Sequence, residues 1–275
     1  MLRQRLITAA ILAVAFGFLL MLMSPQLFSY FMIFALLIAG WEWTDLARIN
    51  SKLGKIGFLC ALFFALVSAF YMLEIQNVFN QQLAYQVSAS IIVLWAIIFL
   101  WIQGYPSSAL LWGSKPIMIL LGLTLLVSTW VALAAIFHLD NGRWLLLLAI
   151  AIVVLADVGG YIAGNIFGRH KLAPVISPGK TWEGMFGGLV LQLLLISILK
   201  MLLPNINVYH LALLVIPVAL CSVIGDLFES MLKRYRGIKD SSSLLPGHGG
   251  VLDRLDGIMP ALPMFLVILT KTNPF

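Results

Sequence analysis

The sequence predicts an all-α, polytopic membrane protein with about nine transmembrane helices, folded as a single integral membrane domain over residues 1–275. Three observations predict this fold class: the composition, the recurrence of uncharged apolar runs, and the uneven distribution of Lys and Arg. Of the 275 residues, 62% are hydrophobic and 10% are charged, whereas a soluble domain carries about 25% charged residues. A soluble core of this size could not bury so much apolar surface, so we expect lipid to surround much of the chain.

Uncharged apolar runs recur along the whole length, and about 20 such residues cross a bilayer as a helix. The first run could be mistaken for a signal peptide, because Arg3 and Arg5 precede it. No small-residue cleavage site follows that run, and eight more runs do, so we keep it as the first span. The expected spans lie near residues 6–23, 27–43, 56–73, 85–103, 116–137, 144–166, 185–203, 207–229 and 255–270.

The Lys and Arg residues predict which way the chain crosses the membrane. Nine spans leave ten flanking segments, which alternate between the two sides. Fourteen of the 17 basic residues fall on the side of the N-terminus, and Arg143, Lys200 and Lys271 fall on the other. Short cytoplasmic loops carry an excess of Lys and Arg, so we expect the N-terminus in the cytoplasm and the C-terminus outside. A missed or extra span would scramble this partition, which supports the count of nine.

The two halves of the chain differ in character. Residues 1–143 are mostly apolar helices joined by short loops, and we expect them to form a scaffold. Residues 144–275 are expected to carry the active site, because they contain two polar loops rich in Gly, Lys, Ser and Asp, near 167–184 and 230–254. The net charge of +6 is spread over short loops between helices. This distribution fits the bias of basic residues that orients membrane spans. Nucleic acid is therefore not an expected partner.

Asp157 lies well inside the sixth expected span. An ionised Asp at the bilayer centre costs roughly 2.5–3.5 kcal/mol, so we expect its side chain to face the bundle interior or a wet cavity. Gly160, Gly164 and Gly168 follow at four-residue spacing, and small residues at that spacing let helices approach closely. Two interpretations stay open: a functional Asp157, or a packing seam with one satisfied polar residue.

The loop after this span contains Ser177-Pro178-Gly179-Lys180-Thr181. Ser followed by Pro is a good helix start, so the pattern predicts a helix whose first turn holds Lys180 and Thr181. The free N–H groups of a helix N-terminus, together with a lysine and hydroxyls, resemble a phosphate cradle. The loop is not a Walker A motif, and a helix cap with a snorkelling lysine explains it nearly as well.

Asp226, Glu229, Ser230 and Lys233, at the end of the eighth expected span, are spaced i, i+3, i+4 and i+7. On a helix these positions share one face. We therefore expect two carboxylates, a hydroxyl and a lysine in a single stripe at the cytoplasmic end. An ion pair between Glu229 and Lys233 is the alternative interpretation, but it does not explain Asp226, which lies deeper.

The next loop places His248 beside Gly249 and Gly250, followed by Asp253 and Asp256 three residues apart. Glycines permit close approach of the backbone to a ligand. Carboxylates that face clustered Lys and Arg suit a Mg²⁺–triphosphate, because Mg²⁺ takes hard oxygen ligands and bridges phosphates. His248 alone would more often be structural, and the chain has no Cys/His set of the kind that binds zinc.

The stretch from Ser230 to Asp256 resembles the pattern of the phosphatidate cytidylyltransferases, also called CDP-diacylglycerol synthases. This pattern is highly specific, because it constrains many positions within 27 residues. Ser241-Ser242-Ser243 is a looser point, where bacterial relatives often carry a Gly, although the pattern tolerates Ser242. The matching residues are Ser230, Lys233, Arg234, Lys239, Asp240, His248, Gly249, Gly250, Asp253, Arg254 and Asp256.

Other segments also resemble elements of this family, so the resemblance covers essentially the whole chain. They are Trp41-Glu42-Trp43, Asp157, Ser177 to Thr181, and Gly225-Asp226. The resemblance implies that CTP and phosphatidic acid give CDP-diacylglycerol and pyrophosphate, in phospholipid biosynthesis at the bacterial cytoplasmic (inner) membrane. The implied partners are these two substrates and membrane lipids, and the glycine-lined spans leave a homodimer open.

The residues and the resemblance together suggest a hypothesis for the site, with Mg²⁺ as the cofactor and a second cation left open. The expected metal ligands are Asp226, Asp253 and Asp256, with Asp157 as a second-tier candidate. The expected catalytic residues are these three aspartates with His248, which bonds a phosphate or protonates the leaving group, and Lys239. The expected substrate- and phosphate-binding residues are Ser177, Lys180, Thr181, Ser230, Lys233, Arg234, Arg254, Gly249 and Gly250.

Two interpretations compete with this one, and the second comes from a different class of protein. The first is another membrane lipid enzyme, either a nucleotidyl- or phosphotransferase or a lipid kinase, which product analysis would separate. The second is an ion-coupled transporter that uses Asp157 and Asp226 as ion sites. Transporters often show repeats and broken helices in both halves, and neither signal is evident in this sequence.

Overall fold

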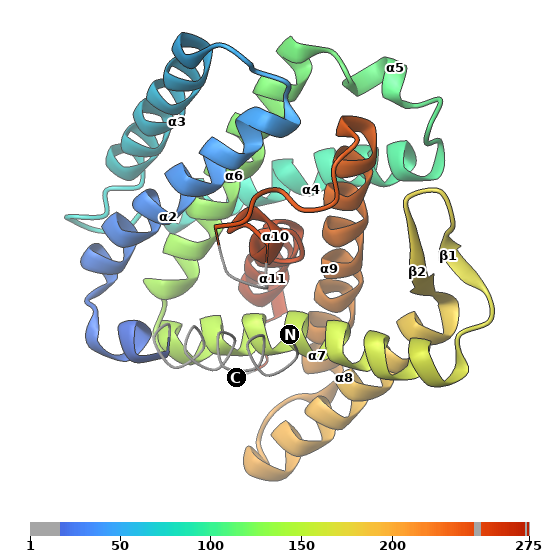
Figure 1. Ribbon diagram of the computed structural model, residues 1–275. Helices are drawn as coiled ribbons and strands as arrows, with labels where there is room; N and C mark the ends of the chain where they lie inside the picture. The colour runs from blue at the N-terminus through green and yellow to red at the C-terminus, as the bar shows by residue number, and fades with distance from the viewer. Residues whose placement is uncertain (1–16, 245–248, 273, 275) are drawn as a thin grey trace.

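The computed structural model describes residues 17–244, 249–272 and 274, and within them it is a bundle of helices with one small hairpin (Figure 1). Seven of the described helices are long and apolar enough to cross a membrane, which confirms an all-α polytopic membrane protein. They are α2 (Pro25–Leu46), α3 (Lys52–Met72), α4 (Gln81–Gln103), α6 (Lys115–Phe137), α7 (Gly142–Phe167), α8 (Trp182–Leu202) and α9 (Val208–Arg236).

Two of the nine expected spans differ from these seven helices. Most of the first, at 6–23, lies outside the described residues, and only 17–22 is described as helical. The last, at 255–270, is split into α10 (Leu252–Leu255) and α11 (Ile258–Thr272). The 15 residues of α11 reach about 22 Å, less than the roughly 30 Å of a hydrocarbon core. The count of nine and the sides of the two termini therefore stay predictions.

Short side-chain caps explain where several of these helices begin. Ser24, Ser51, Asn80 and Asn207 each accept a hydrogen bond from a backbone N–H in the first turn of the following helix. Such caps satisfy donors that the helix itself leaves unpaired. At the other end of α9, Gly237 has a φ of 80°, a left-handed conformation that favours glycine and terminates helices.

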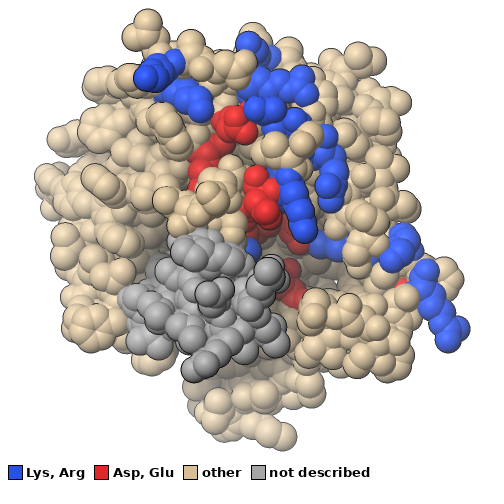
Figure 2. Space-filling model, in the orientation of Figure 1, with Lys and Arg blue, Asp and Glu red and all other residues tan. Residues whose placement is uncertain are grey.

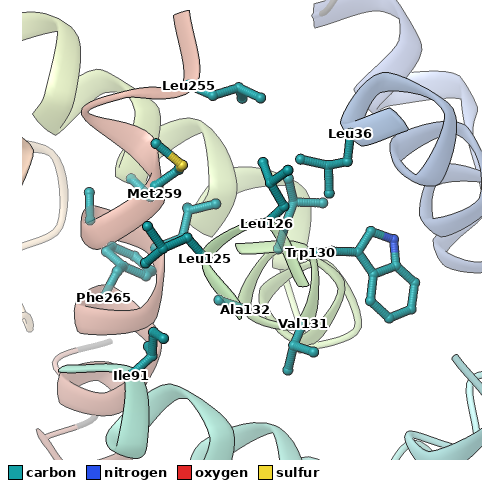
Figure 3. Close-up of a cluster of buried hydrophobic side chains, with 14 of the residues drawn as sticks. Leu36, Ile91, Leu125, Leu126, Trp130, Val131, Ala132, Leu255, Met259 and Phe265 are labelled. Carbon is teal, nitrogen blue, oxygen red and sulfur yellow. The ribbon is translucent and has the colours of Figure 1, made fainter. Parts of the chain in front are cut away.

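The apolar core lies where α6 and α11 pack among the other helices. α11 contacts α4, α6, α7 and α9, and it occupies the middle of the bundle in Figure 1. Figure 3 shows Leu125 and Leu126 of α6 between Leu36 of α2 and Met259 of α11. A central helix surrounded on several sides is apolar on all of them, which explains the mostly apolar sequence of α11.

Two buried tryptophans fix α2 against α6. The indole N–H of Trp43 donates to the carbonyl oxygen of Met118 at 2.8 Å, and that of Trp130 donates to Ser29 at 3.1 Å. A buried indole N–H needs such a partner. A Cβ at Gly122 would collide with the Trp43 ring, so this glycine makes room for the indole. These contacts set the register of α2 relative to α6.

A β-hairpin separates α7 from α8, where the sequence predicted a helix start. β1 (Lys171–Ala173) pairs antiparallel with β2 (Ser177–Thr181), and Lys171 lies opposite Thr181. The expectation that Lys180 and Thr181 occupy a first helical turn was wrong. The helix begins at Trp182, and Thr181 is its N-cap, with its hydroxyl accepting from the N–H of Gly184 at 3.1 Å.

α7 and α8 cross with their backbones in direct contact. A Cβ added at Gly159 would lie 2.7 Å from the carbonyl oxygen of Gly187, and one at Gly188 would lie 2.8 Å from that of Ala156. No side chain fits at such separations, so glycines at these positions permit the approach. The packing seam, one of the two interpretations left open for the segment around Asp157, is therefore present between α7 and α8, and a functional role of Asp157 stays a prediction.

Candidate active site

Most of the acidic residues singled out in the sequence line one cavity of about 370 Å³. It lies between α7, α9 and the loop that leads into α10, and we call it the polar cavity. Figure 2 shows Asp and Glu gathered near the middle of this face, bordered by Lys and Arg. The charged residues that line it are Asp157, Asp226, Lys233, Asp240, Asp253, Arg254 and Asp256.

A second cavity, of about 420 Å³, lies between α7, α8, α9 and the hairpin. We call it the apolar cavity, because leucines, alanines and glycines form much of its wall. Ser177, Lys180 and Thr181 of the hairpin line it together with Asp157 and Asp226. Asp157 and Asp226 thus belong to both cavities. The two compartments meet at these two carboxylates.

Lys180 joins the hairpin to α9 at this meeting point. Its ammonium forms an ion pair with Asp226, and the two side chains are 24% and 29% exposed. Ser230, one turn further along α9, donates to the other carboxylate oxygen of Asp226 at 3.4 Å. Asp226 therefore remains accessible from the cavities while its orientation is set by two neighbours.

Gly225 allows α9 to approach the break between α10 and α11. A Cβ at this position would collide with the carbonyl oxygen of Asp256 and lie 2.8 Å from Pro260. Because the helices meet this closely, Asp226 and Asp256 reach the same cavity from different elements. Glycine is therefore needed before Asp226, because a side chain at position 225 would keep α9 away from this break.

The rest of the α9 stripe is internally paired. Lys233 donates to Glu229 at 2.8 Å and to Asp253 at 2.7 Å, and the Glu229 side chain is fully buried. The ion pair between Glu229 and Lys233 that the sequence offered as an alternative is therefore present. One ammonium between two carboxylates compensates much of their charge, as buried charges require.

Asp253 is surrounded by donors from its own protein. Besides Lys233, its carboxylate accepts from the N–H and hydroxyl of Ser241 at 3.0 and 2.9 Å, and from the N–H of Gly250 at 2.7 Å. Burial alone would raise its pKa, but the bonds from Lys233 and Gly250 outweigh burial and lower the pKa of Asp253 to about 2. Asp253 is thus an ionised anchor of the loop.

The glycines after His248 also have contacts within the protein. Gly249 has a φ of 78°, and a Cβ at Gly250 would lie 2.5 Å from a carboxylate oxygen of Glu42. These two positions accept only glycine because of the backbone conformation and the crowding. Their predicted role in binding substrate stays a prediction, and His248 lies outside the described residues.

The remaining basic residues lie around the same region. Arg234 donates from Nε to the carbonyl oxygen of Ile176 at 3.0 Å, which ties α9 to the hairpin turn. Arg254 lines the polar cavity, and Lys239 is exposed at the start of the loop that follows α9. Their expected roles toward phosphate stay predictions.

Comparison with known proteins identifies the family. The family model described as the cytidylyltransferase family matches residues 3–271. The chain belongs to this family.

Three cytidylyltransferases illustrate the similarity. The phosphatidate cytidylyltransferase of Pseudomonas aeruginosa is 36% identical over 286 residues, which cover 98% of this chain and 97% of the relative. That of Haemophilus influenzae is 35% identical over 283 residues, with 96% and 97% covered. That of Staphylococcus epidermidis is 45% identical over 134 residues, which cover 48% of this chain and 52% of the relative.

A metal centre can be tested against the side chains of this cytidylyltransferase. Among the described residues, no three Asp, Glu, His or Cys side chains already form a closed metal-binding group. Asp157, Asp226 and Asp256 nevertheless all line the polar cavity. Mg²⁺ keeps several waters and takes only one or two carboxylates beside substrate phosphates. This open set of oxygens therefore fits Mg²⁺ bound together with a nucleotide.

Sequence reasoning missed one residue that bonds the loop beside the polar cavity, Glu42 on α2. It is 4% exposed, and its carboxylate bonds to both described ends of the loop between α9 and α10. The sequence feature that could have revealed Glu42 is a carboxylate within the Trp41-Glu42-Trp43 segment of a mostly apolar helix. A buried charge in such a place is expensive unless it is fully bonded.

Proposed function

We propose that this protein transfers the cytidylyl group of CTP to phosphatidic acid, giving CDP-diacylglycerol and pyrophosphate. The observation that carries the proposal is that a polar and an apolar cavity meet at Asp157 and Asp226. A reaction between a water-soluble nucleotide and a membrane lipid needs such a junction. The names of the relatives from Pseudomonas and Haemophilus support the same activity.

The polar cavity is the proposed site for the nucleotide. Its wall contains cationic Arg254 and Lys233 as well as carboxylates, and Arg and Lys neutralise phosphate charge. Asp157, Asp226 and Asp256 are the proposed metal ligands. When bound there, Mg²⁺ neutralises charge on the triphosphate and on the pyrophosphate that leaves. Asp253 is a weaker ligand candidate because its oxygens already accept from Lys233, Ser241 and Gly250.

The apolar cavity is the proposed site for phosphatidic acid. Its hydrocarbon wall comes from α7, α8 and α9, and Ser177, Lys180 and Thr181 provide polar groups. α8 buries few of its residues inside the protein, so lipid can lie against it. We assign Lys180 to the lipid phosphate, which would bring that phosphate to the junction.

The reaction depends more on positioning the two substrates than on general acid–base catalysis. A lipid phosphate oxygen attacks the α-phosphorus of CTP and forms a new P–O bond, and the bond from the α-phosphorus to the oxygen that joins the α- and β-phosphates breaks, so that pyrophosphate leaves with that oxygen. A phosphate monoester dianion is already nucleophilic, so no strong general base is needed. Lys180 would hold the attacking phosphate while Arg254 and Lys233 stabilise charge on the triphosphate.

The bacterial cytoplasmic membrane is the proposed location, with the active site facing the cytoplasm. The bias of Lys and Arg toward one set of loops supports this orientation. The bacterial origin of the relatives supports the compartment. A cytoplasmic site would also give direct access to CTP.

The proposal is tested with purified protein in detergent, labelled CTP and phosphatidic acid, with and without Mg²⁺. We expect labelled CDP-diacylglycerol and one equivalent of pyrophosphate, only when Mg²⁺ is present. Release of a nucleoside diphosphate would instead identify a lipid kinase. An absence of lipid-linked label under all conditions would contradict the proposal.

A further inference from the structure

Glu42 joins the two described ends of the loop between α9 and α10. One carboxylate oxygen accepts from the hydroxyl of Ser242 at 2.6 Å and from the N–H of Val251 at 3.1 Å. The other accepts from the N–H of Leu252 at 2.7 Å and shares, at 3.3 Å, the single proton of the Ser241 hydroxyl with Asp253. A single side chain on α2 thus closes a loop that lies about 200 positions away in the sequence.

The charge of Glu42 is compensated by neutral donors. Three donors bond Glu42 alone, namely Ser242, Val251 and Leu252, and the shared Ser241 hydroxyl faces a remaining acceptor position of the carboxylate. Val251 and Leu252 offer backbone N–H groups, which can only donate. An amide at position 42 would turn one acceptor into a donor and leave at least one of these N–H groups without its partner.

Glu42 itself stands on a rigid support. The next residue, Trp43, is fully buried and bonded to Met118 of α6, so α2 cannot rotate without breaking that contact. Gly250 packs against the Glu42 carboxylate so closely that no larger residue fits. The position of the loop is therefore set by α2 and α6, which belong to the half of the chain expected to be only a scaffold.

A chain of contacts leads from Glu42 to the polar cavity. Ser241 lies between Glu42 and Asp253, and Asp253 in turn bonds Lys233. Asp253, Arg254 and Asp256 follow directly on the segment that Glu42 holds, and all three line the polar cavity. A shift of the loop would therefore move these groups relative to Asp226 on α9.

We propose that Glu42 is a positioning residue for the polar cavity: it holds the loop so that Arg254 and Asp256 face Asp226 in the geometry that a nucleotide triphosphate and its metal require. The identity of this ligand rests on the proposed function. Glu42 does not line either cavity, and its effect passes through the loop. The apolar cavity is built from α7, α8, α9 and the hairpin, none of which Glu42 bonds.

The test compares Glu42→Gln and Glu42→Asp with the wild type. For Glu42→Gln we expect kcat/KM for CTP to fall by about 10- to 100-fold, as for residues that orient metal ligands. We also expect a higher Mg²⁺ concentration to be needed for half-maximal activity. The KM for phosphatidic acid should stay the same. Glu42→Asp keeps the acceptors and should retain more activity than Glu42→Gln. Glu74→Gln, an exposed position in the loop between α3 and α4, is the matched control.

Hydrogen exchange at the amides of Val251 and Leu252 provides a readout that does not depend on activity. Glu42→Gln should increase exchange there and leave α6 unchanged. If wild-type protein makes no CDP-diacylglycerol while this exchange increases, the proposed function fails and the role in holding the loop stands. Unchanged exchange, or a loss of activity with unaltered KM for CTP and Mg²⁺ requirement, would overturn the positioning role.

Discussion

Lys180, at the end of the hairpin, forms an ion pair with Asp226 on α9, at the boundary shared by the two cavities. The pair brings together a cation suited to a phosphate and a carboxylate suited to a metal. Neither side chain is fully buried, so substrates can reach both. This contact links the two compartments on which the proposed reaction depends.

Asp226→Asn should abolish Mg²⁺-dependent turnover while the protein still folds and inserts. The amide keeps the size of the side chain but loses the charge that holds a divalent cation. Activity is measured with labelled CTP, and folding by elution from a sizing column in detergent. Asp140→Asn, at an exposed aspartate between α6 and α7, is the control. Activity close to wild type in Asp226→Asn would remove this residue from the site.

The Lys180–Asp226 pair can be examined with a double-mutant cycle. Lys180→Met alone should raise the KM for phosphatidic acid and lower kcat, because the lipid phosphate loses its cation. Residues in direct contact show coupling of about 0.5–3 kcal/mol, so the losses of thermal stability from Lys180→Met and Asp226→Asn should not add. Strict additivity of the two effects on thermal stability in detergent would mean that the two residues act independently.

Gly225→Ala should reduce activity at least about fivefold, since forcing extra volume into a tight contact costs about 1–3 kcal/mol. The added methyl would push α9 away from the backbone of Asp256, which separates Asp226 from Asp256. Gly57→Ala in α3, where a Cβ meets nothing within 4 Å, is the control. The measurement is kcat/KM for CTP at several Mg²⁺ concentrations. Equal effects of the two substitutions would contradict the steric explanation.

Asp253→Asn should lower thermal stability because Lys233 and the Ser241 segment lose a charged acceptor. Lys233 keeps Glu229 as a partner, so the loss is that of hydrogen bonds to a charged group, about 1.5–3 kcal/mol, and we expect the melting temperature in detergent to drop by at least about 3 °C. The pKa of Asp253 is about 2 in the folded protein, against about 3.9 when unfolded.

The sign of the pH effect follows from this depressed pKa. The ionised carboxylate contributes its full stability above about pH 4, and the contribution is lost as the pH falls toward about 2. The difference in melting temperature between wild type and Asp253→Asn should therefore be constant near neutral pH and shrink below about pH 4. A difference that grows on acidification would show that folding raises the pKa of Asp253 and does not lower it.

Much of the helical architecture could be predicted from the sequence because hydropathy is a local property. Seven of the nine expected spans correspond to long apolar helices of the structure. The stripe of Asp226, Glu229, Ser230 and Lys233 was equally predictable, since residues within one helix have fixed relative positions. The short, central α11 was not distinguished from a span, because apolar composition does not separate burial in protein from exposure to lipid.

The hairpin and the Glu42 contacts could not be predicted in the same way. Ser177-Pro178 favours a helix start locally, but pairing with the segment around Lys171 places it in a strand. Glu42 bonds residues about 200 positions away, and no local pattern specifies such a partner. Only the packing of α2 on α6 brings this carboxylate to the loop.

By itself the sequence determined the membrane class, the helical segments and the family pattern from Ser230 to Asp256, because these depend on composition, periodicity and fixed local spacing. Only the tertiary structure decided that Lys180 faces Asp226, that Lys233 serves both Glu229 and Asp253, and that Glu42 holds the loop. Contacts of this kind depend on how separate helices pack against one another. Their geometry appears only when the whole chain has folded.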